Sequence, residues 1–298
     1  MVKALRDIVQ LAKTRGPKTC VVVAAEDPEI LLATNEAMIH GIAKIILIGN
    51  LEKIKIAADN AGVDITGHEI IEENNPSVAA HKGVQLISQG KADLLVKGLI
   101  GTADILKAVL NKDRGLKTGR LLSHLSVFEM PEDDKVIIFS DGAMNIAPSL
   151  EEKVEITQNA INVGHTLGID NPRVAIIAAI ESLNSSMPAT IDAACISKMA
   201  ERGQIKGGII DGPLALDNAI SPISAKIKRI DSPVAGQADI LIMPDIETGN
   251  VFYKSLIYMA DKCCASVVVG ASVPIVLTSR ADSYKSKFYS LALGIVVS

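Results

Sequence analysis

The sequence predicts an α/β protein of two lobes built on mostly parallel sheets, and three observations indicate this class. Short runs of Val, Ile and Leu alternate with longer segments of helical spacing, which is the pattern of parallel strands covered on both faces. The chain has 298 residues, more than a single hydrophobic core usually serves. Hydrophobic residues make up 48% of the chain and charged residues 21%, as in an ordinary globular protein.

The alternation begins near the start of the chain. Apolar runs at 20–25, 44–49 and 93–97 predict buried strands. Between them, 28–39 and 76–89 have the spacing of helices, and each begins with a proline. A first helical turn tolerates proline because the missing N–H would have no partner there.

The second part of the chain repeats this pattern. We expect its strands at 135–139, 173–180, 207–211, 238–243, 265–270 and 274–278. The acidic, proline-containing segment 130–135 is the best candidate for the connection between the lobes. Cys263 and Cys264 fall within a helical pattern that starts near Asn250, and we expect them to pack in the core.

The composition disfavours several partners. Aromatic residues make up 3% of the chain and the net charge is −4, which argues against nucleic acid. Apolar stretches such as 174–180 are too short to cross a bilayer, and 1–6 starts no signal peptide, so we expect a cytoplasmic protein that does not bind membranes. The four cysteines form no Cys-x-x-Cys motif, and we expect reduced thiols and no metal site.

Polar turns follow three predicted strands of the second part. They run from Ser140 to Asn145, from Asp211 to Asn218 and from Asp245 to Asn250, and each contains a glycine. Ligands of open α/β sheets bind beyond the carboxyl ends of the strands, and glycine lets the backbone approach a ligand. A single turn of this kind also fits an ordinary helix cap. The three turns together indicate a binding site without naming its ligand.

The last predicted strand is followed by Ser279, Arg280, Asp282 and Ser283. Hydroxyl groups beside a guanidinium, ahead of a helix with free N–H groups, would form a cradle for phosphate. The same residues equally fit a helix start that Asp282 or Ser283 caps, with Arg280 in solvent. Both interpretations remain open on these residues alone.

A second candidate anion site follows the predicted strand at 93–97. Gly98, Gly101 and Thr102 precede an amphipathic helix that carries Asp104 and Lys107. This is not a P-loop, and neither the dinucleotide-binding glycine motif nor the hydrolase elbow occurs in the chain.

The run from Ser232 to Lys254 resembles a characteristic segment of the phosphate acetyltransferase and phosphate butyryltransferase family. Further segments that fall at the family's spacing are Gly98–Asp104, Ser123–Met130, Asp141–Pro148, Asp211–Asp217 and Ser279–Arg280. The resemblance covers almost the whole chain. The short chain and the run Thr278 to Ser283 look more like the butyryl branch than the acetyl branch.

The resemblance implies two α/β lobes like those of isocitrate dehydrogenase, with an active site in the cleft between them. The first lobe would comprise 1–134 plus 272–298, so that the end of the chain returns to it. The second would comprise 135–271. A homodimer or a higher homo-oligomer would be the assembly.

The implied reaction moves a short acyl group between CoA and inorganic phosphate: butyryl-CoA plus phosphate gives butyryl phosphate plus CoA, through a ternary complex. CoA would be a substrate, and no cofactor would be needed. The implied catalytic residues are Ser279, Arg280, Asp282 and Ser123. The implied substrate-binding residues are Gly98, Thr102, Asp104, Lys107, Asp245, Asn250, Lys254 and Ser283.

One residue departs from the family. Phosphate acetyltransferases carry an aspartate, a candidate base, seven residues after the serine, where this chain has Ser286. This departure favours one of three alternatives that stay open, the regulator without catalysis. The protein could act on acetyl-CoA, or it could be a regulator that binds acyl-CoA or phosphate and has lost catalysis. It could also be a metal- and NAD-dependent dehydrogenase with Asp211, Asp217 and Asp245 as metal ligands.

Overall fold

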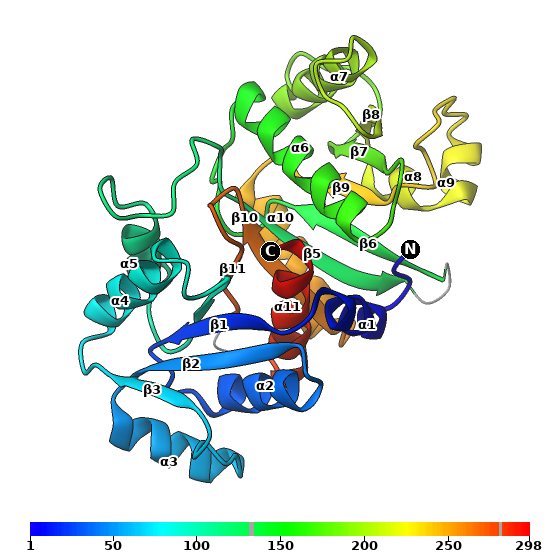
Figure 1. The fold of residues 1–298 in the computed structure, drawn as a ribbon. Coiled ribbons are helices and arrows are strands. Elements are labelled where there is room, and N and C mark those ends of the chain that lie inside the picture. Colours follow the sequence, from blue (N-terminus) through cyan, green and yellow to red (C-terminus); the bar gives the residue numbers. More distant parts are fainter. Residues whose placement is uncertain (131–133, 280–281) are drawn as a thin grey trace. The chain divides into compact units, whose positions relative to one another are not determined.

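The computed structural model describes residues 1–130, 134–279 and 282–298, which form two compact units. Residues 5–120 and 263–298 form one, called here the terminal unit. Residues 1–4 and 121–262 form the other, called here the central unit. Each consists of helices packed on a largely parallel array of strands, which confirms the predicted α/β class (Figure 1).

The strands of the terminal unit lie in the order β3-β2-β1-β4-β11-β10 (Figure 1). They are β1 (Lys18–Val23), β2 (Ala43–Gly49), β3 (Glu69–Glu72), β4 (Leu94–Lys97), β10 (Cys264–Val269) and β11 (Ile275–Val276). All adjacent pairs are parallel except β10 with β11. The helices are α1 (Leu5–Arg15), α2 (Pro28–Ile39), α3 (Leu51–Ala61), α4 (Pro76–Ser88), α5 (Thr102–Val109) and α11 (Tyr284–Val297).

Local sequence explains where α2 and α4 begin. Both start at the predicted prolines. The side chain of Asp27 accepts the N–H of Glu29 at the start of α2, and that of Asn75 accepts the N–H of Ser77 at the start of α4. These side-chain caps satisfy N–H groups that a helix cannot pair internally.

Helix α11 is buried over most of its length and packs on α1, α2 and β10. The end of the chain therefore packs against the first two helices of the terminal unit. Lys287 on α11 is 1% exposed, and its Nζ lies 3.1 Å from Oδ2 of Asp27. A buried ammonium needs such a partner because the interior cannot solvate an isolated charge.

The strands of the central unit lie in the order β5-β6-β9-β7-β8. They are β5 (Ser123–Met130), β6 (Lys135–Ser140), β7 (Arg173–Ile177), β8 (Ile209–Leu214) and β9 (Ile240–Ile242). The helices are α6 (Leu150–Thr166), α7 (Pro188–Glu201), α8 (Leu216–Ile220), α9 (Pro222–Ile227) and α10 (Ile246–Tyr258). Strands β6, β9, β7 and β8 are parallel, so their carboxyl ends share one edge of the sheet.

Two details differ from the expectations. Segment 130–135 joins the antiparallel strands β5 and β6, where Met130 pairs with Lys135. Because β5 pairs with β6, it belongs with the central unit, and the unit bounds differ from the expected 1–134 plus 272–298 and 135–271. The helical prediction for Cys264 was wrong: α10 ends at Tyr258 and β10 begins at Cys264. Among the described residues, none of the helices combines the length and hydrophobicity that crossing a membrane requires.

Candidate functional site

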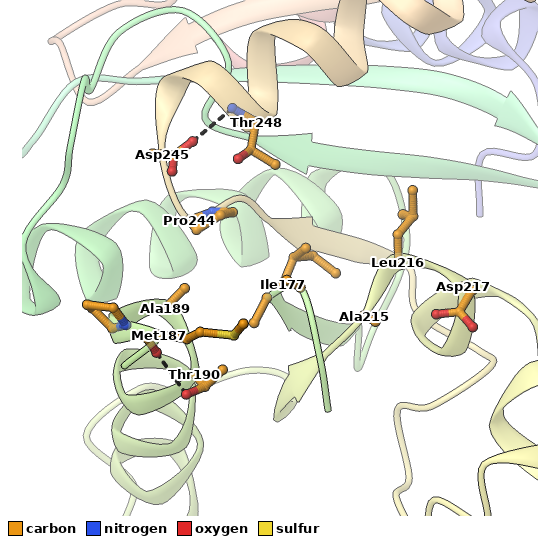
Figure 2. Close-up of a pocket in the computed structure, with 13 residues that line it drawn as sticks. Ile177, Met187, Ala189, Thr190, Ala215, Leu216, Asp217, Pro244, Asp245 and Thr248 are labelled. Atoms are coloured by element: carbon orange, nitrogen blue, oxygen red, sulfur yellow. Dashed lines mark hydrogen bonds between the residues drawn. The ribbon is translucent and has the colours of Figure 1, made fainter. Parts of the chain in front are cut away.

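A pocket of about 600 Å³ lies in the central unit at the carboxyl ends of β7, β8 and β9 (Figure 2). Its lining comes from the segments that follow these strands and from the first turns of α7 and α10. The lining residues are Ile177, Ala178, Ala179, Met187, Pro188, Ala189, Thr190, Ala215, Leu216, Asp217, Pro244, Asp245 and Thr248. This is the position at which open α/β sheets bind ligands.

The lining of this pocket is mainly aliphatic. Figure 2 shows the Met187 side chain extending from the start of α7 toward Ile177. The carboxylates of Asp217 and Asp245 are the charged groups of the lining, and none of the described lining residues is basic or aromatic. The volume lies in the range of sites for small molecules, about 300–1,000 Å³.

A buried threonine holds the α7 wall of the pocket. Thr190 is 0% exposed. Its hydroxyl accepts the N–H of Asn184 at 3.0 Å and donates to the carbonyl of Met187 at 2.8 Å, and the second bond is drawn in Figure 2. The loop before α7 is therefore tied to the first turn of the helix.

The predicted residues on α10 have three different surroundings. Asp245 caps the helix through the N–H of Thr248, at 2.8 Å, and lines the pocket (Figure 2). Asn250 donates through Nδ2 to the carbonyl of Gly142, at 3.1 Å. Lys254 is exposed. Only Asp245 of the three faces the pocket.

An ion-pair network holds the wall at Asp217. Nζ of Lys228 lies 3.1 Å from the Asp217 carboxylate and 3.2 Å from that of Glu181. Hydrogen bonds from Ser224 and then Lys228 lower the pKa of Asp217, and the bond from Lys228 lowers the pKa of Glu181. Asp217 is therefore ionised at neutral pH, and its charge is shared with Lys228 at the wall of the pocket.

The loop after β6 is built around a buried carboxylate. Asp141 is 3% exposed and accepts the N–H groups of Ala143 and Met144, at 2.8 and 2.9 Å, and that of His124, at 3.1 Å. A Cβ at Gly249 would lie 2.2 Å from the carbonyl oxygen of Asp141. The glycine in the family segment is thus required for α10 to approach this loop.

Ser123, at the start of β5, was predicted to contact the reacting groups. It is 0% exposed, and its hydroxyl accepts Nδ2 of Asn159 at 2.9 Å. The hydroxyl is thus enclosed by protein in this conformation.

In the terminal unit, the ends of β4 and β11 are tied together. Nζ of Lys97 lies 3.3 Å from the carbonyl oxygen of Thr278 and 3.4 Å from that of Gly98. A Cβ at Gly98 would lie 2.0 Å from the carbonyl oxygen of Ala24. Gly98 is therefore fixed by close packing of the backbone after β4 against the backbone after β1.

Of the predicted phosphate cradle, the structure describes Ser279, Asp282 and Ser283. Arg280 lies outside the described residues. Ser279 is exposed, and its N–H donates to the buried carboxylate of Asp282 at 2.7 Å. The cap of α11 is Ser283, whose hydroxyl accepts the N–H of Ser286 at 3.3 Å. Asp282 thus positions the backbone of Ser279 and is not the helix cap.

The other predicted anion site is the start of α5. Thr102 and Asp104 are exposed in its first turn, and Gly101 provides no side-chain cap. Nζ of Lys107 lies 3.7 Å from Asp104 in a solvent-exposed pair. Because glycine has no side chain, residue 101 does not cap the start of α5. An anion site at a helix start needs N–H groups that no side chain caps.

Ser286 has a structural role. It is 3% exposed, its hydroxyl accepts the N–H of Cys264 at 3.3 Å, and it lies 3.2 Å from Sγ of Cys263. The residue that replaces the family's aspartate thus joins α11 to the start of β10. Burial also raises the pKa of the Cys20 thiol, so this cysteine is not an activated nucleophile.

The family model of the Phosphate acetyl/butaryl transferase family matches residues 4–80 and 73–295. A phosphate butyryltransferase from Clostridium acetobutylicum is 46% identical over 297 residues, 100% of this chain and 99% of that protein. A phosphate acetyltransferase from Thermotoga maritima is 42% identical and covers 98% of this chain and 99% of its own length. The crystal structure of a branched-chain phosphotransacylase from Enterococcus faecalis aligns at a TM-score of 0.83 and 32% identity, over 94% of this chain and 98% of that one.

These findings define the protein as an enzyme of the acyltransferase class. The chain belongs to the phosphate acetyl/butyryl transferase family.

The dehydrogenase alternative is not favoured. Asp211 accepts the N–H of Gly212, Asp217 pairs with Lys228, and Asp245 caps α10. The part of the chain that the structure describes contains no group of three His, Cys, Asp or Glu side chains able to hold a metal ion. The three aspartates thus have separate roles within the protein.

The sequence alone did not single out most of the pocket. Met187, Ala189 and Thr190 were missed because they are ordinary apolar or small residues, whereas Leu216 lies in the predicted turn Asp211 to Asn218. A usable signal was present, since Pro188 opens a helix soon after a predicted strand, at the edge where ligands bind.

Proposed function

We propose that the protein is a phosphate butyryltransferase, which transfers a short acyl group reversibly between CoA and inorganic phosphate. The observation that carries the proposal is the 46% identity to a phosphate butyryltransferase along the whole of both chains. The likeness to a branched-chain phosphotransacylase, at 32% identity, supports acyl groups larger than acetyl.

In the proposed reaction, a phosphate oxygen attacks the carbonyl carbon of the thioester. A tetrahedral oxyanion forms, the C–S bond breaks, and CoA leaves as a thiolate that then takes up a proton. Both substrates are bound together, so the rate gain comes from proximity and from donors that stabilise the oxyanion. CoA enters and leaves as a substrate, and the proposal needs no metal or other cofactor.

The resemblance assigns the phosphate to Ser279 and Arg280. In support, the exposed Ser279 is held by the carboxylate of Asp282. A guanidinium next to it would bind two phosphate oxygens at once. Ser123 is enclosed by protein, so we assign it to the support of β5 and the oxyanion to backbone N–H groups.

The phosphates of CoA are assigned to the start of α5. Gly98 and Thr102 lead into the first turn of α5, which has no side-chain cap, and Lys107 adds a positive charge on an exposed helix face. Asp104, Asn250, Lys254 and Ser283 remain proposed binding residues on the same resemblance.

We also propose a homodimer, for which helix α10 gives support. Gly249 is the buried residue of this helix, while Val251 and Tyr258 are 65% and 64% exposed and Met259, just after it, is 85% exposed. Large exposed apolar residues grouped on one element are typical of protein interfaces. Light scattering should give the mass of a dimer, and Met259→Lys should shift it toward the monomer.

The function is tested by release of CoA from acetyl-, propionyl-, butyryl- and isobutyryl-CoA, with and without inorganic phosphate. We expect release that depends on phosphate and is fastest with the four-carbon substrates. Equal rates without phosphate would identify a thioesterase and contradict the proposal. A preference for acetyl-CoA would support the acetyltransferase alternative.

A further inference from the structure

We infer that the pocket at the carboxyl ends of β7, β8 and β9 binds the acyl chain of the substrate. Met187 and Ala189, at the start of α7, would set how long a chain is accepted. The inference rests on the proposed function and names the part of acyl-CoA that this pocket holds.

Charge excludes most of the substrate from the pocket. Inorganic phosphate and the phosphates of CoA are all anionic. Asp217 and Asp245 line the pocket, and no basic side chain is among its described lining residues. Lys228, behind Asp217, is shared by the carboxylates of Asp217 and Glu181, so this network keeps a net negative charge. Like charges within a partly enclosed site repel, so the pocket selects a neutral part of the substrate. The neutral parts are the acyl chain, the pantetheine arm and the adenine.

Shape and chemistry then favour the acyl chain. An adenine is bonded to the ribose that bears a phosphate, whereas the acyl chain is separated from all phosphates by the pantetheine arm. The described lining offers no aromatic ring on which a base could stack, but it offers the aliphatic side chains of Ile177, Met187 and Leu216. Such a lining favours methylene groups, at about 25 cal/mol for each Å² buried.

Small residues create the space. Ala178 and Ala215 are buried at the ends of β7 and β8, and Ala189 lies in the first turn of α7. A longer side chain at any of them would project into the pocket. Because the Thr190 hydroxyl holds the loop at Met187, the wall cannot move aside freely. We therefore expect the wall at Met187 to limit the length of the acyl chain that the pocket accepts.

The test compares three variants on acetyl-, butyryl- and hexanoyl-CoA. Ala189→Leu fills the pocket, Met187→Ala enlarges it, and Ala200→Leu is the matched control, since Ala200 lies on α7 outside the lining. For the unmodified enzyme, kcat/KM should rise about fourfold for each methylene until the pocket is full.

Opposite shifts are expected from the two pocket variants. Ala189→Leu should lower kcat/KM for butyryl-CoA relative to acetyl-CoA by roughly sixteenfold, the effect of displacing about two methylenes. Met187→Ala should raise kcat/KM for hexanoyl-CoA relative to kcat/KM for butyryl-CoA. Ala200→Leu should leave all ratios unchanged. The ratios report on the pocket even where a variant lowers the amount of folded enzyme, because both substrates meet the same population.

Two results would overturn the assignment. Unchanged ratios in both pocket variants would place the acyl chain elsewhere while phosphate-dependent activity persists, so the proposed function would stand. An equal rise in KM for all acyl-CoA chain lengths in Ala189→Leu, absent with acyl-pantetheine substrates, would assign the pocket to the adenine. If the unmodified protein releases no CoA in response to phosphate, the proposed function itself fails, and the acyl assignment fails with it.

Discussion

The buried pair between Lys287 and Asp27 should stabilise α11 against the terminal unit. Lys287→Met removes the ammonium that pairs with Asp27. Asp27 is only 8% exposed, so its carboxylate then lacks this cation in a buried position. Removing one partner of a buried pair costs about 3–5 kcal/mol. Asp27 keeps the N–H of Glu29 as a partner at 3.0 Å, so we expect a cost near the lower limit, about 3 kcal/mol.

Hydrogen–deuterium exchange of peptides from 284–297 is the appropriate assay. A single free energy of unfolding is poorly defined for a chain of two units, whereas exchange reports the local opening of α11. A cost of about 3 kcal/mol corresponds to a roughly 150-fold increase in the opening equilibrium. The matched control is Lys55→Met, which breaks the exposed pair with Glu52 and should leave exchange in α11 unchanged.

The double variant Lys287→Met with Asp27→Asn separates charge from packing. The introduced amide oxygen would still accept the N–H of Glu29, but no uncompensated charge would remain, so most of the protection in α11 should return. An increase in exchange below tenfold for the single variant would refute the reasoning. A double variant as unprotected as the single variant would show that the packing of the lysine stem, and not the charge, was lost.

Three further outcomes are expected. Arg280→Ala should raise the KM for phosphate and lower kcat together, and an unchanged phosphate dependence would remove Arg280 from the site. Gly249→Ala should disturb the β6 loop, since its Cβ would lie 2.2 Å from the Asp141 carbonyl oxygen, and should increase hydrogen–deuterium exchange in peptides from 141–149 more than Ala200→Leu does. The folded-state pKa values of Asp217 and Glu181 are lowered, so their contribution to stability is present above the usual carboxyl pKa and is lost as pH falls through the folded values. The protection factors of amides in 215–228, which compare exchange with the unfolded rate at the same pH, should therefore fall below about pH 4, and protection factors that do not change with pH would count against the network.

The sequence predicted helix starts and buried strands well where local rules decide them. Pro28 and Pro76 open α2 and α4 as expected, and the apolar runs of β1 and β2 lie in the core. The hairpin of β5 and β6 was missed, because pairing between strands is a tertiary contact that the acidic segment joining them does not reveal. For the same reason the helix was extended too far toward Cys264, which lies at the start of β10, a strand that pairs with β11 through Val268 and Ile275.

The residues of the candidate site also fall into two groups, those that the sequence predicted and those that it did not. Asp245 was predicted from a polar turn after a strand, and it lines the pocket. Met187 and Ala189 were not, because apolar and small residues carry no chemical signature until the fold brings several strand ends together. Ser123 was predicted from a family segment, and the structure adds what the sequence could not show, namely that its hydroxyl is buried and accepts a hydrogen bond from Asn159.

Ser286 bears on whether the proposed reaction needs a general base. Phosphate is already anionic at neutral pH, so an attacking oxygen need not lose a proton first. The leaving group is a thiolate, whose parent thiol has a pKa near about 8.5, so its departure needs little acid assistance. Position 286 is 3% exposed and binds the N–H of Cys264, and a carboxylate there would be costly to bury. The serine is therefore compatible with catalysis in which binding and orientation, rather than proton abstraction, provide the rate enhancement.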